Sequence, residues 1–274
     1  MLLKEFLPAP LMHRASGGLT LSVMPGAVPR VRCRLQAVLE ASRHLALISH
    51  PAVAGVIDCV QAHGTVYLVG PYRQGRTLQS HILASRGQVA KGHAGLSESA
   101  VLSVGLDLLQ VLGAVHDAGI LHLDIKPANL LLTSDGELVL LDFDAAQPMA
   151  DPGPLAFEAR AKVAYTPGFS APESLLVPAS QGPWTDIYAV GACLYACMLG
   201  HPPPEGLSRV ASDAVPKRLA ALQGWYSPLL RSAVRAALEL DSRRRPQDVA
   251  ALTQLLSAAA QALDGEAAQS ATVI

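Results

Sequence analysis

The chain has 274 residues, a length sufficient for one large or two small domains. Half of its residues are hydrophobic and only 16% are charged, and this composition excludes a largely disordered protein. Its net charge of −1 and its pI of about 6.7 give no sign of the basic stripe that nucleic-acid binding requires. The N-terminus lacks the residue order of a signal peptide, and the longest apolar run, residues 187–199, is too short to span a bilayer. The four cysteines have no metal-type spacing. We therefore expect a cytoplasmic protein that binds neither nucleic acid nor a membrane.

Three short strands and a helix are predicted at the N-terminus. Residues 2–7, 11–15 and 19–24 are β-type runs, separated by a Pro-Ala-Pro and a Gly-Gly sequence that interrupt strands. Residues 34–48 carry apolar side chains at helical spacing. This pattern predicts an amphipathic helix after the third strand.

A β-hairpin and a long helix are predicted next. Residues 54–61 and 65–69 alternate between apolar and polar side chains, and His63-Gly64 supplies the turn between them. Ser97 is a suitable N-cap for an amphipathic helix over residues 98–118. This helix leads directly into the most informative stretch of the sequence.

That stretch places polar side chains within an apolar frame. Asp124, Lys126 and Asn129 precede two apolar runs joined by the turn sequence Ser134-Asp135-Gly136, so a second hairpin is predicted. The hairpin brings Asp142 back beside Asn129 and Asp124. Oxygen ligands of this kind suit Mg²⁺, and a spare carboxylate can accept a proton from a hydroxyl group. These are the groups that phosphoryl transfer requires.

Two motifs in this stretch resemble those of a known family. Residues 122–129, His-Leu-Asp-Ile-Lys-Pro-Ala-Asn, resemble the catalytic loop of protein kinases. Asp142-Phe143-Asp144 resembles the Asp-Phe-Gly metal motif of that family, with Asp144 in the place of glycine. The combination at this spacing is far more specific than either motif alone.

Further matches follow in the family's order. Residues 165–173 resemble the substrate-side loop that ends in Ala-Pro-Glu, and residues 184–191 resemble the start of the central buried helix. Residues 241–246 resemble a late Arg-Pro motif. The resemblance covers about residues 70–260 and is weak over residues 1–69. The chain is most similar to bacterial Ser/Thr kinases of eukaryotic type.

The resemblance implies an α+β, bilobal protein-kinase-like fold with a small β-rich N-lobe and a larger, mostly helical C-lobe. The N-lobe is reduced, because the segment where the family has a glycine-rich loop, residues 8–12, contains no glycine. The expected boundaries are residues 1–70 for the N-lobe, 71–75 for the hinge, 76–263 for the C-lobe with its catalytic loop and activation segment, and 264–274 for a flexible tail.

The resemblance also assigns roles in the C-lobe. Asp124 would be the catalytic base, Lys126 would neutralise the transferred phosphoryl group, and Asn129 with Asp142 would hold Mg²⁺. Thr166 would belong to the substrate loop. Four further residues would be structural: His122 in the catalytic loop, Asp186 as the group that holds that loop, and Glu173 with Arg245 as a buried ion pair.

Nucleotide binding is harder to place in the N-lobe. By the resemblance, the carbonyl of Pro71 and the N–H of Arg73 would hold adenine, and proline keeps its carbonyl. The phosphate-binding lysine of the family falls on Ser22, with Glu40 as its helix partner. A rival register, with a strand over residues 28–35, offers Arg30 or Arg32 instead. Lys4 is another possible cation, although we interpret it as a solvated surface lysine.

Two substitutions within the motifs carry separate expectations. Asp144 adds a second carboxylate beside Asp142, which is either a metal ligand or a charge turned to solvent. Leu123 replaces the arginine that reads activation-loop phosphate in many kinases. The segment 145–163 is therefore expected to order without phosphorylation.

Three functions remain open from the sequence. The first is a Ser/Thr protein kinase that transfers the γ-phosphate of ATP to a protein hydroxyl with Mg²⁺ as cofactor. The second is a pseudokinase that acts as a nucleotide-binding or partner-binding scaffold, because the glycine-rich loop is missing and Ser22 stands where the strand lysine is expected. The third is a small-molecule kinase of the aminoglycoside or choline type. The expected partner is a protein substrate, and the chain is expected to be a monomer or to be regulated by a partner.

Overall fold

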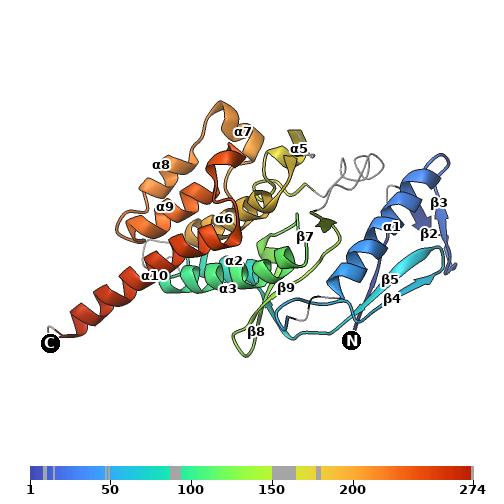
Figure 1. Ribbon diagram of the computed structural model, residues 1–274, viewed down its shortest axis with the longest axis horizontal. Coiled ribbons are helices and arrows are strands. Elements are labelled where there is room, and N and C mark those ends of the chain that lie inside the picture. Colours follow the sequence, from blue (N-terminus) through green and yellow to red (C-terminus); the bar gives the residue numbers. More distant parts are fainter. Residues whose placement is uncertain are drawn as a thin grey trace.

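The chain consists of a small β-rich N-terminal part and a larger helical C-terminal part (Figure 1). A computed structural model describes residues 1–8, 11–14, 16–46, 48, 50–86, 94–149, 165–176 and 180–272. Most of the segment 145–163 lies outside these residues, so the expectation for it remains a prediction.

The N-terminal part contains two small antiparallel sheets. β1 (Leu2–Glu5) pairs with β5 (Thr65–Gly70), which also pairs with β4 (Asp58–Ala62). β2 (Met12–Arg14) and β3 (Leu21–Val23) pair only with each other among the described strands. The three predicted strands are therefore confirmed, but the first belongs to a different sheet from the other two. This division decides which strand faces the site.

Helix α1 (Val28–Leu45) packs against β5. It begins six residues before the predicted helix, because Pro29 suits the first turn of a helix and good helix formers follow it. The rival strand over residues 28–35 is therefore wrong. The predicted β4–β5 hairpin is confirmed, and both turn residues, His63 and Gly64, have positive φ angles (52° and 80°), as a two-residue hairpin turn of type I′ requires.

A third sheet joins the two parts. β6 (Gly75–Thr77) pairs with β8 (Leu130–Thr133), which pairs with β9 (Leu138–Leu140), so the predicted second hairpin is confirmed. Gly75 is required here, because a Cβ atom at this position would lie 2.4 Å from the carbonyl oxygen of Leu132. Ala54 N–H donates to the Leu140 carbonyl, which attaches the segment before β4 to β9.

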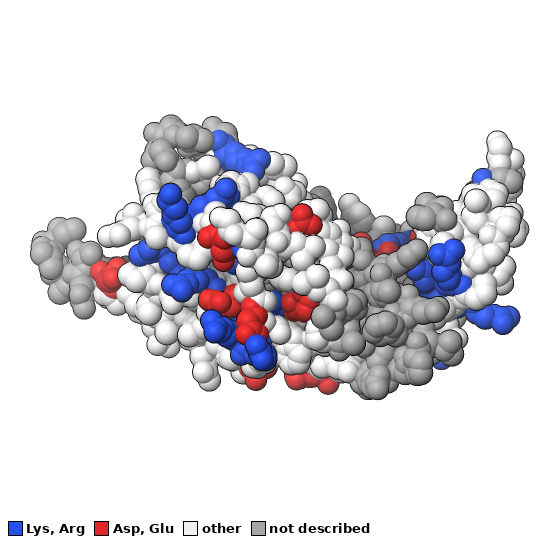
Figure 2. All heavy atoms as spheres, turned by 90° about the horizontal axis from the view of Figure 1, so that it is seen from above, with Lys and Arg blue, Asp and Glu red and all other residues white. Residues whose placement is uncertain are grey.

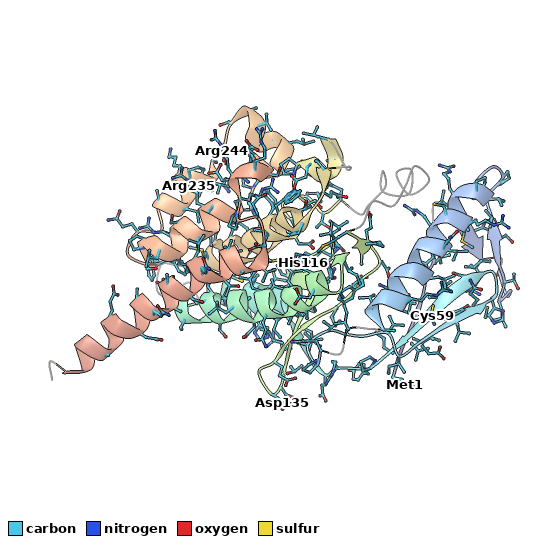
Figure 3. The ribbon with its side chains drawn as sticks, viewed as in Figure 1. Met1, Cys59, His116, Asp135, Arg235 and Arg244 are labelled. Carbon is cyan, nitrogen blue, oxygen red and sulfur yellow. The ribbon has the colours of Figure 1, made fainter. Side chains whose placement is uncertain are left out.

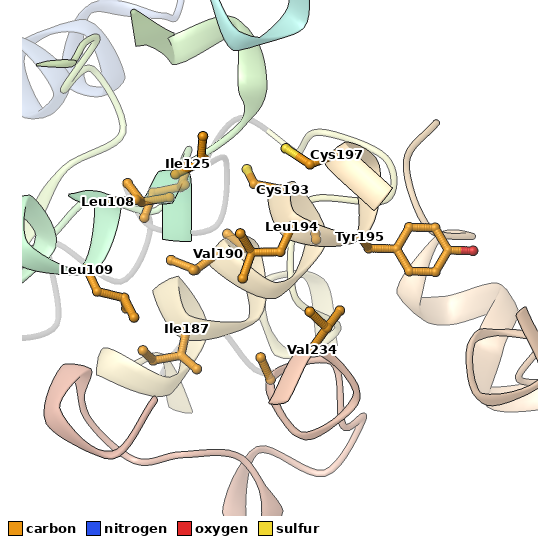
Figure 4. Packing of buried hydrophobic residues seen from close by; sticks show 14 of the residues in the cluster. Leu108, Leu109, Ile125, Ile187, Val190, Cys193, Leu194, Tyr195, Cys197 and Val234 are labelled. Carbon is orange, nitrogen blue, oxygen red and sulfur yellow. The ribbon is translucent and has the colours of Figure 1, made fainter. Parts of the chain in front are cut away.

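The core of the helical part is built around α6 (Pro183–Leu199), whose residues from Thr185 to Met198 are all buried (Figure 4). Helix α3 (Glu98–Asp117), N-capped by Ser97 as predicted, packs against α6, α10 and β9. α3 is long and apolar enough by composition to cross a membrane, but half of that window is buried inside this bundle. The remaining elements are α2 (Leu78–Arg86), β7 (Ile120–Leu121), η2 (Pro127–Asn129), β10 (Gln147–Pro148), α5 (Glu173–Leu176), α7 (Gly206–Ala211), α8 (Val215–Ala220), α9 (Pro228–Ala237), η4 (Ser242–Arg244) and α10 (Val249–Thr272).

The C-terminal helix is longer than the sequence indicated. α10 continues to Thr272, so residues 264–272, predicted as a flexible tail, are helical. Ala-rich sequence with good helix propensity explains this extension.

On the face shown in Figure 2, basic and acidic side chains are interspersed over the helical part.

A buried ion pair connects α5 to the segment after η4. The Arg245 guanidinium donates to both Glu173 carboxylate oxygens, at 2.6 and 2.9 Å, and both residues are less than 9% exposed. Thr185 Oγ1 donates to the same carboxylate at 3.0 Å, and Arg245 lies over the ring of Tyr188. The contact that the resemblance implied is present. It fixes the end of the substrate-side loop to the base of α6.

Replacing Arg245 should therefore destabilise the protein strongly. Arg245→Met leaves the Glu173 carboxylate buried without its cation, and such a loss typically costs about 3–5 kcal/mol. Urea unfolding would measure it. The control is Arg243→Met two residues earlier, where the side chain is 87% exposed, and a change within about 0.5 kcal/mol is expected. Equal losses for the two variants would contradict a structural role for the ion pair.

Candidate active site

The predicted catalytic groups meet in the segment between β7 and β8. Lys126 Nζ lies 2.7 Å from Asp124 Oδ2, and Asn129 Nδ2 donates both to that oxygen, at 3.1 Å, and to the Asp124 carbonyl, at 2.9 Å. Asp124 is 9% exposed and Asn129 is 7% exposed. The Asp124 carboxylate is thus held in one orientation by a cation and an amide.

The substrate-side loop contacts the same carboxylate. Thr166 Oγ1 donates to Asp124 Oδ1 at 3.0 Å, and Lys126 Nζ reaches the Thr166 hydroxyl at 3.4 Å. Because Oδ2 is occupied by Lys126 and Asn129, Oδ1 is the oxygen that faces a hydroxyl donor. The structure therefore brings together three groups that are separated by as many as 42 residues in the sequence.

Asp186 on α6 fixes the backbone of the segment between β7 and β8 through hydrogen bonds. Its carboxylate accepts hydrogen bonds from the N–H groups of His122 (2.9 Å) and Leu123 (2.8 Å). Leu123 has a φ of +61°, a left-handed conformation that is unfavourable for a leucine. Burial works to raise the pKa of the Asp186 carboxyl, but the hydrogen bond and charge of His116 outweigh burial and lower it. An ionised Asp186 thus stabilises a strained turn directly before Asp124.

His122 links the catalytic segment to Asp142. Its Nε2 contacts the Leu141 carbonyl at 3.1 Å, and its Nδ1 accepts from the Asp124 N–H at 3.3 Å. Burial lowers the pKa of this imidazole, so a neutral ring with the proton on Nε2 satisfies both contacts. The Phe143 ring packs edge-on against it, with 4.7 Å between centroids.

Asp142 forms an ion pair with the N-terminal part. It lies two residues beyond β9 with a φ of +61°, and its Oδ1 is 2.5 Å from the Nζ of Lys4 on β1. Asp144 Oδ2 lies 2.8 Å from the same ammonium. Burial alone would raise the pKa of Asp142, but the Lys4 ammonium outweighs burial and lowers it. The pKa of Lys4 is raised, because its two carboxylate partners outweigh desolvation.

These contacts correct three sequence interpretations. Lys4 is not a solvated surface lysine, and Asp144 is not a charge turned to solvent. Ser22 does not occupy the position of the missing strand lysine: it is exposed on β3, where it pairs with His13. The physical reason is sheet register. β1 is the strand that pairs with β5, and this pairing sets Lys4 opposite Leu68 on the edge that reaches Asp142.

The other predicted N-lobe residues have less definite positions. Glu40 lies on α1, but its side chain is outside the described atoms. Pro71 and Arg73 lie between β5 and β6, in the connection between the two parts, and the Arg73 side chain donates to the Pro51 carbonyl. Their roles toward adenine remain predictions.

One residue of the site was missed by sequence reasoning altogether. His116 lies near the end of α3 (Figure 3). Its Nε2 contacts Asp186 Oδ2 at 2.9 Å. The only available signal was a histidine in the last turn of a predicted amphipathic helix. That signal is weak, because a histidine near a helix C-terminus is common.

A small pocket opens beside these groups. Its polar lining includes Asp124, Ser170 and Asp186, and its apolar lining includes Leu123 and Phe169. It lies between the catalytic segment and the substrate-side loop.

Comparisons with known proteins agree with this arrangement. The protein kinase domain model matches residues 30–251. Serine/threonine-protein kinase PknK of Mycobacterium tuberculosis (strain ATCC 25618 / H37Rv) is 33% identical over 225 residues, which are 79% of this chain and 19% of the relative. Serine/threonine-protein kinase PknD of Chlamydia caviae is 32% identical over 238 residues, which are 78% of this chain and 25% of that protein. The chain thus spans about a fifth to a quarter of the length of these two relatives.

A solved structure has the same architecture. The structure titled "PpkA-294 apo form" superposes with a TM-score of 0.72 at 27% sequence identity, covering 93% of this chain and 85% of that one. The α+β, two-part arrangement of strands and helices is therefore the bilobal kinase fold. With a family model that spans most of its length and relatives of this similarity, the chain belongs to the protein kinase family.

Proposed function

We propose that the protein is an active Ser/Thr protein kinase that transfers the γ-phosphoryl group of ATP to a hydroxyl group of a protein substrate. The observation that carries this proposal is the ion pair between Lys4 and Asp142. The sequence alone placed a serine where the phosphate-binding lysine was expected, and this substitution, together with the missing glycine-rich loop, was the argument for a pseudokinase. The Lys4 ammonium at the Asp142 carboxylate removes the part of that argument that concerns the lysine.

Asp124 is proposed to orient the acceptor hydroxyl and to take its proton. The Thr166 contact supports this role, because it demonstrates that Oδ1 can accept from a hydroxyl at 3.0 Å. As the new bond forms between the acceptor oxygen and the γ-phosphorus, the bond between that phosphorus and the ADP leaving oxygen breaks. Lys126, 2.7 Å from Asp124, is suitably placed to neutralise charge on the transferred group.

The donor groups fit a hard divalent cation. Asn129 uses its Nδ2 for two hydrogen bonds to Asp124, so its amide oxygen remains available as a ligand. Asp142 is a low-pKa carboxylate with a second oxygen beyond the one that meets Lys4. Carboxylate and amide oxygens together with phosphate are ligands that Mg²⁺ prefers. When bound, ATP would supply the phosphoryl group and Mg²⁺ would neutralise the charge of its phosphates.

The small-molecule kinase alternative is less well supported. Those enzymes usually lack the Lys126 and Ala-Pro-Glu features, whereas here Lys126 bridges Asp124 and Thr166. Glu173 of the Ala-Pro-Glu sequence is also anchored by Arg245. Both contacts position a substrate-side loop of the protein-kinase type.

The first test concerns the catalytic base. Asp124→Asn keeps the size of the side chain but removes proton acceptance, so transfer of ³²P from labelled ATP to a generic protein substrate should fall by about 10²–10⁴-fold. The thermal unfolding midpoint should remain close to that of the wild type. Labelling that is equal in wild type and variant would show that Asp124 is not the base or that the activity is a contaminant.

The second test distinguishes Lys4 from Ser22 as the phosphate cation. Lys4→Met should weaken ADP binding by roughly 10- to 100-fold in calorimetry, because a charge-assisted contact to phosphate is lost. Adenosine, which has no phosphate, should bind both forms alike. Ser22→Lys should leave ADP affinity unchanged, since Ser22 lies on the separate β2–β3 sheet. Tighter ADP binding by Ser22→Lys with no effect of Lys4→Met would restore the original alignment.

The third test concerns the metal. Asp142→Ala should abolish the increase in ADP affinity that Mg²⁺ produces in the wild type, because it deletes a ligand that lies beside the phosphate. The measurement is ADP calorimetry with Mg²⁺ and with EDTA. An undiminished Mg²⁺ effect in Asp142→Ala would rule out Asp142 as a metal ligand.

A further inference from the structure

Two carboxylates and one ammonium form a compact charge cluster at the junction of the two lobes. Lys4 Nζ lies 2.5 Å from Asp142 Oδ1 and 2.8 Å from Asp144 Oδ2. The Asp144 N–H also donates to Asp142 Oδ1 at 3.3 Å. The three side chains are 35–40% exposed, so they are accessible from solvent and yet in direct contact. One cation between two anions leaves a net negative charge at the cluster.

The turn that carries the two aspartates directs both of them to Lys4. Asp142 adopts a left-handed backbone conformation, and the side chain of the intervening Phe143 packs against the His122 ring. Phe143 is thereby held against the catalytic segment while its two neighbours contact β1. The Asp-Phe-Gly motif of protein kinases has glycine where this chain has Asp144, so the second carboxylate is a feature of the present sequence.

From this geometry we infer that Asp144 is a positioning residue that keeps Lys4 at the phosphate-binding site when Asp142 binds the metal ion. This inference rests on the proposed function. A divalent cation on Asp142 would repel the neighbouring ammonium, since two positive charges a few ångströms apart interact unfavourably even near a protein surface. Asp144 offers Lys4 a carboxylate that the metal does not require. Lys4 therefore stays beside the phosphates instead of turning into solvent.

The inference predicts a specific pattern of nucleotide affinities. Asp144→Asn should weaken ADP binding in Mg²⁺ by roughly twofold to fivefold, which is the range expected for a partly exposed ion pair. Adenosine affinity should not change, because adenosine makes no contact with Lys4. ADP affinity in EDTA should change by less than about twofold, because without metal Lys4 keeps Asp142 as its partner. Asp144→Glu should restore most of the lost affinity.

The experiment is calorimetry of ADP and adenosine with the whole chain, in Mg²⁺ and in EDTA. The matched control is Asp135→Asn at the exposed tip of the β8–β9 hairpin (Figure 3), which should behave as wild type. A second comparison uses Lys4→Met. In that background Asp144→Asn should have no further effect, because Asp144 is inferred to act only through Lys4.

Three results would overturn the inference. Unchanged Mg²⁺·ADP binding by Asp144→Asn would show that Asp144 does not position Lys4. Tighter binding would show that Asp144 competes with the phosphates for the Lys4 ammonium. An equal loss for ADP and adenosine would indicate a general disturbance of the site. A full additional loss in the Lys4→Met background would show that Asp144 acts independently, for example as a metal ligand. Failure of the wild type to bind ADP would instead refute the proposed function, so the two failures are distinguishable.

Discussion

The contact between Lys4 and Asp142 is the interaction on which the site depends. It joins residues 138 positions apart and connects β1 of the small lobe to the turn after β9. Partly buried carboxylates in this turn need a cation, and Lys4 is the residue that sheet register delivers to them. Because β1 pairs with β5, the position of Lys4 is set by the whole β1-β5-β4 sheet and not by the short strand itself. The N-terminal strand is therefore part of the site.

The large lobe supplies the opposite wall through a rigid support. α6 is buried over most of its length, and it carries Asp186 into hydrogen bonds with the backbone of the catalytic segment. Those bonds stabilise the left-handed Leu123 and so fix the direction of Asp124. Near the start of the same helix, Thr185 donates a hydrogen bond to Glu173, which forms the buried ion pair with Arg245. Backbone strain near the carboxylate is thus compensated by an ionised group whose own position is determined by the core.

The sequence was sufficient for the large lobe because its chemistry is local. Asp124, Lys126, Asn129 and Asp142 lie within 20 residues at the open end of one predicted hairpin, and its register, with Leu130 opposite Leu140, brings the two flanking segments together. The small lobe could not be predicted in this way. Ser22 and Lys4 both lie on short β-type runs, and only pairing with β5, more than 60 residues later, distinguishes them. The His116 contact with Asp186 spans 70 residues and likewise has no local signature.

Whether Lys4 and the catalytic segment form one nucleotide site can be seen in a crystal structure of the complex with Mg²⁺ and ADP. We expect the Lys4 ammonium to lie within hydrogen-bond distance of an ADP phosphate oxygen, and the metal to be bound by Asp142 and Asn129. Phosphates held by another cation such as Arg30, with Lys4 turned into solvent, would contradict this expectation.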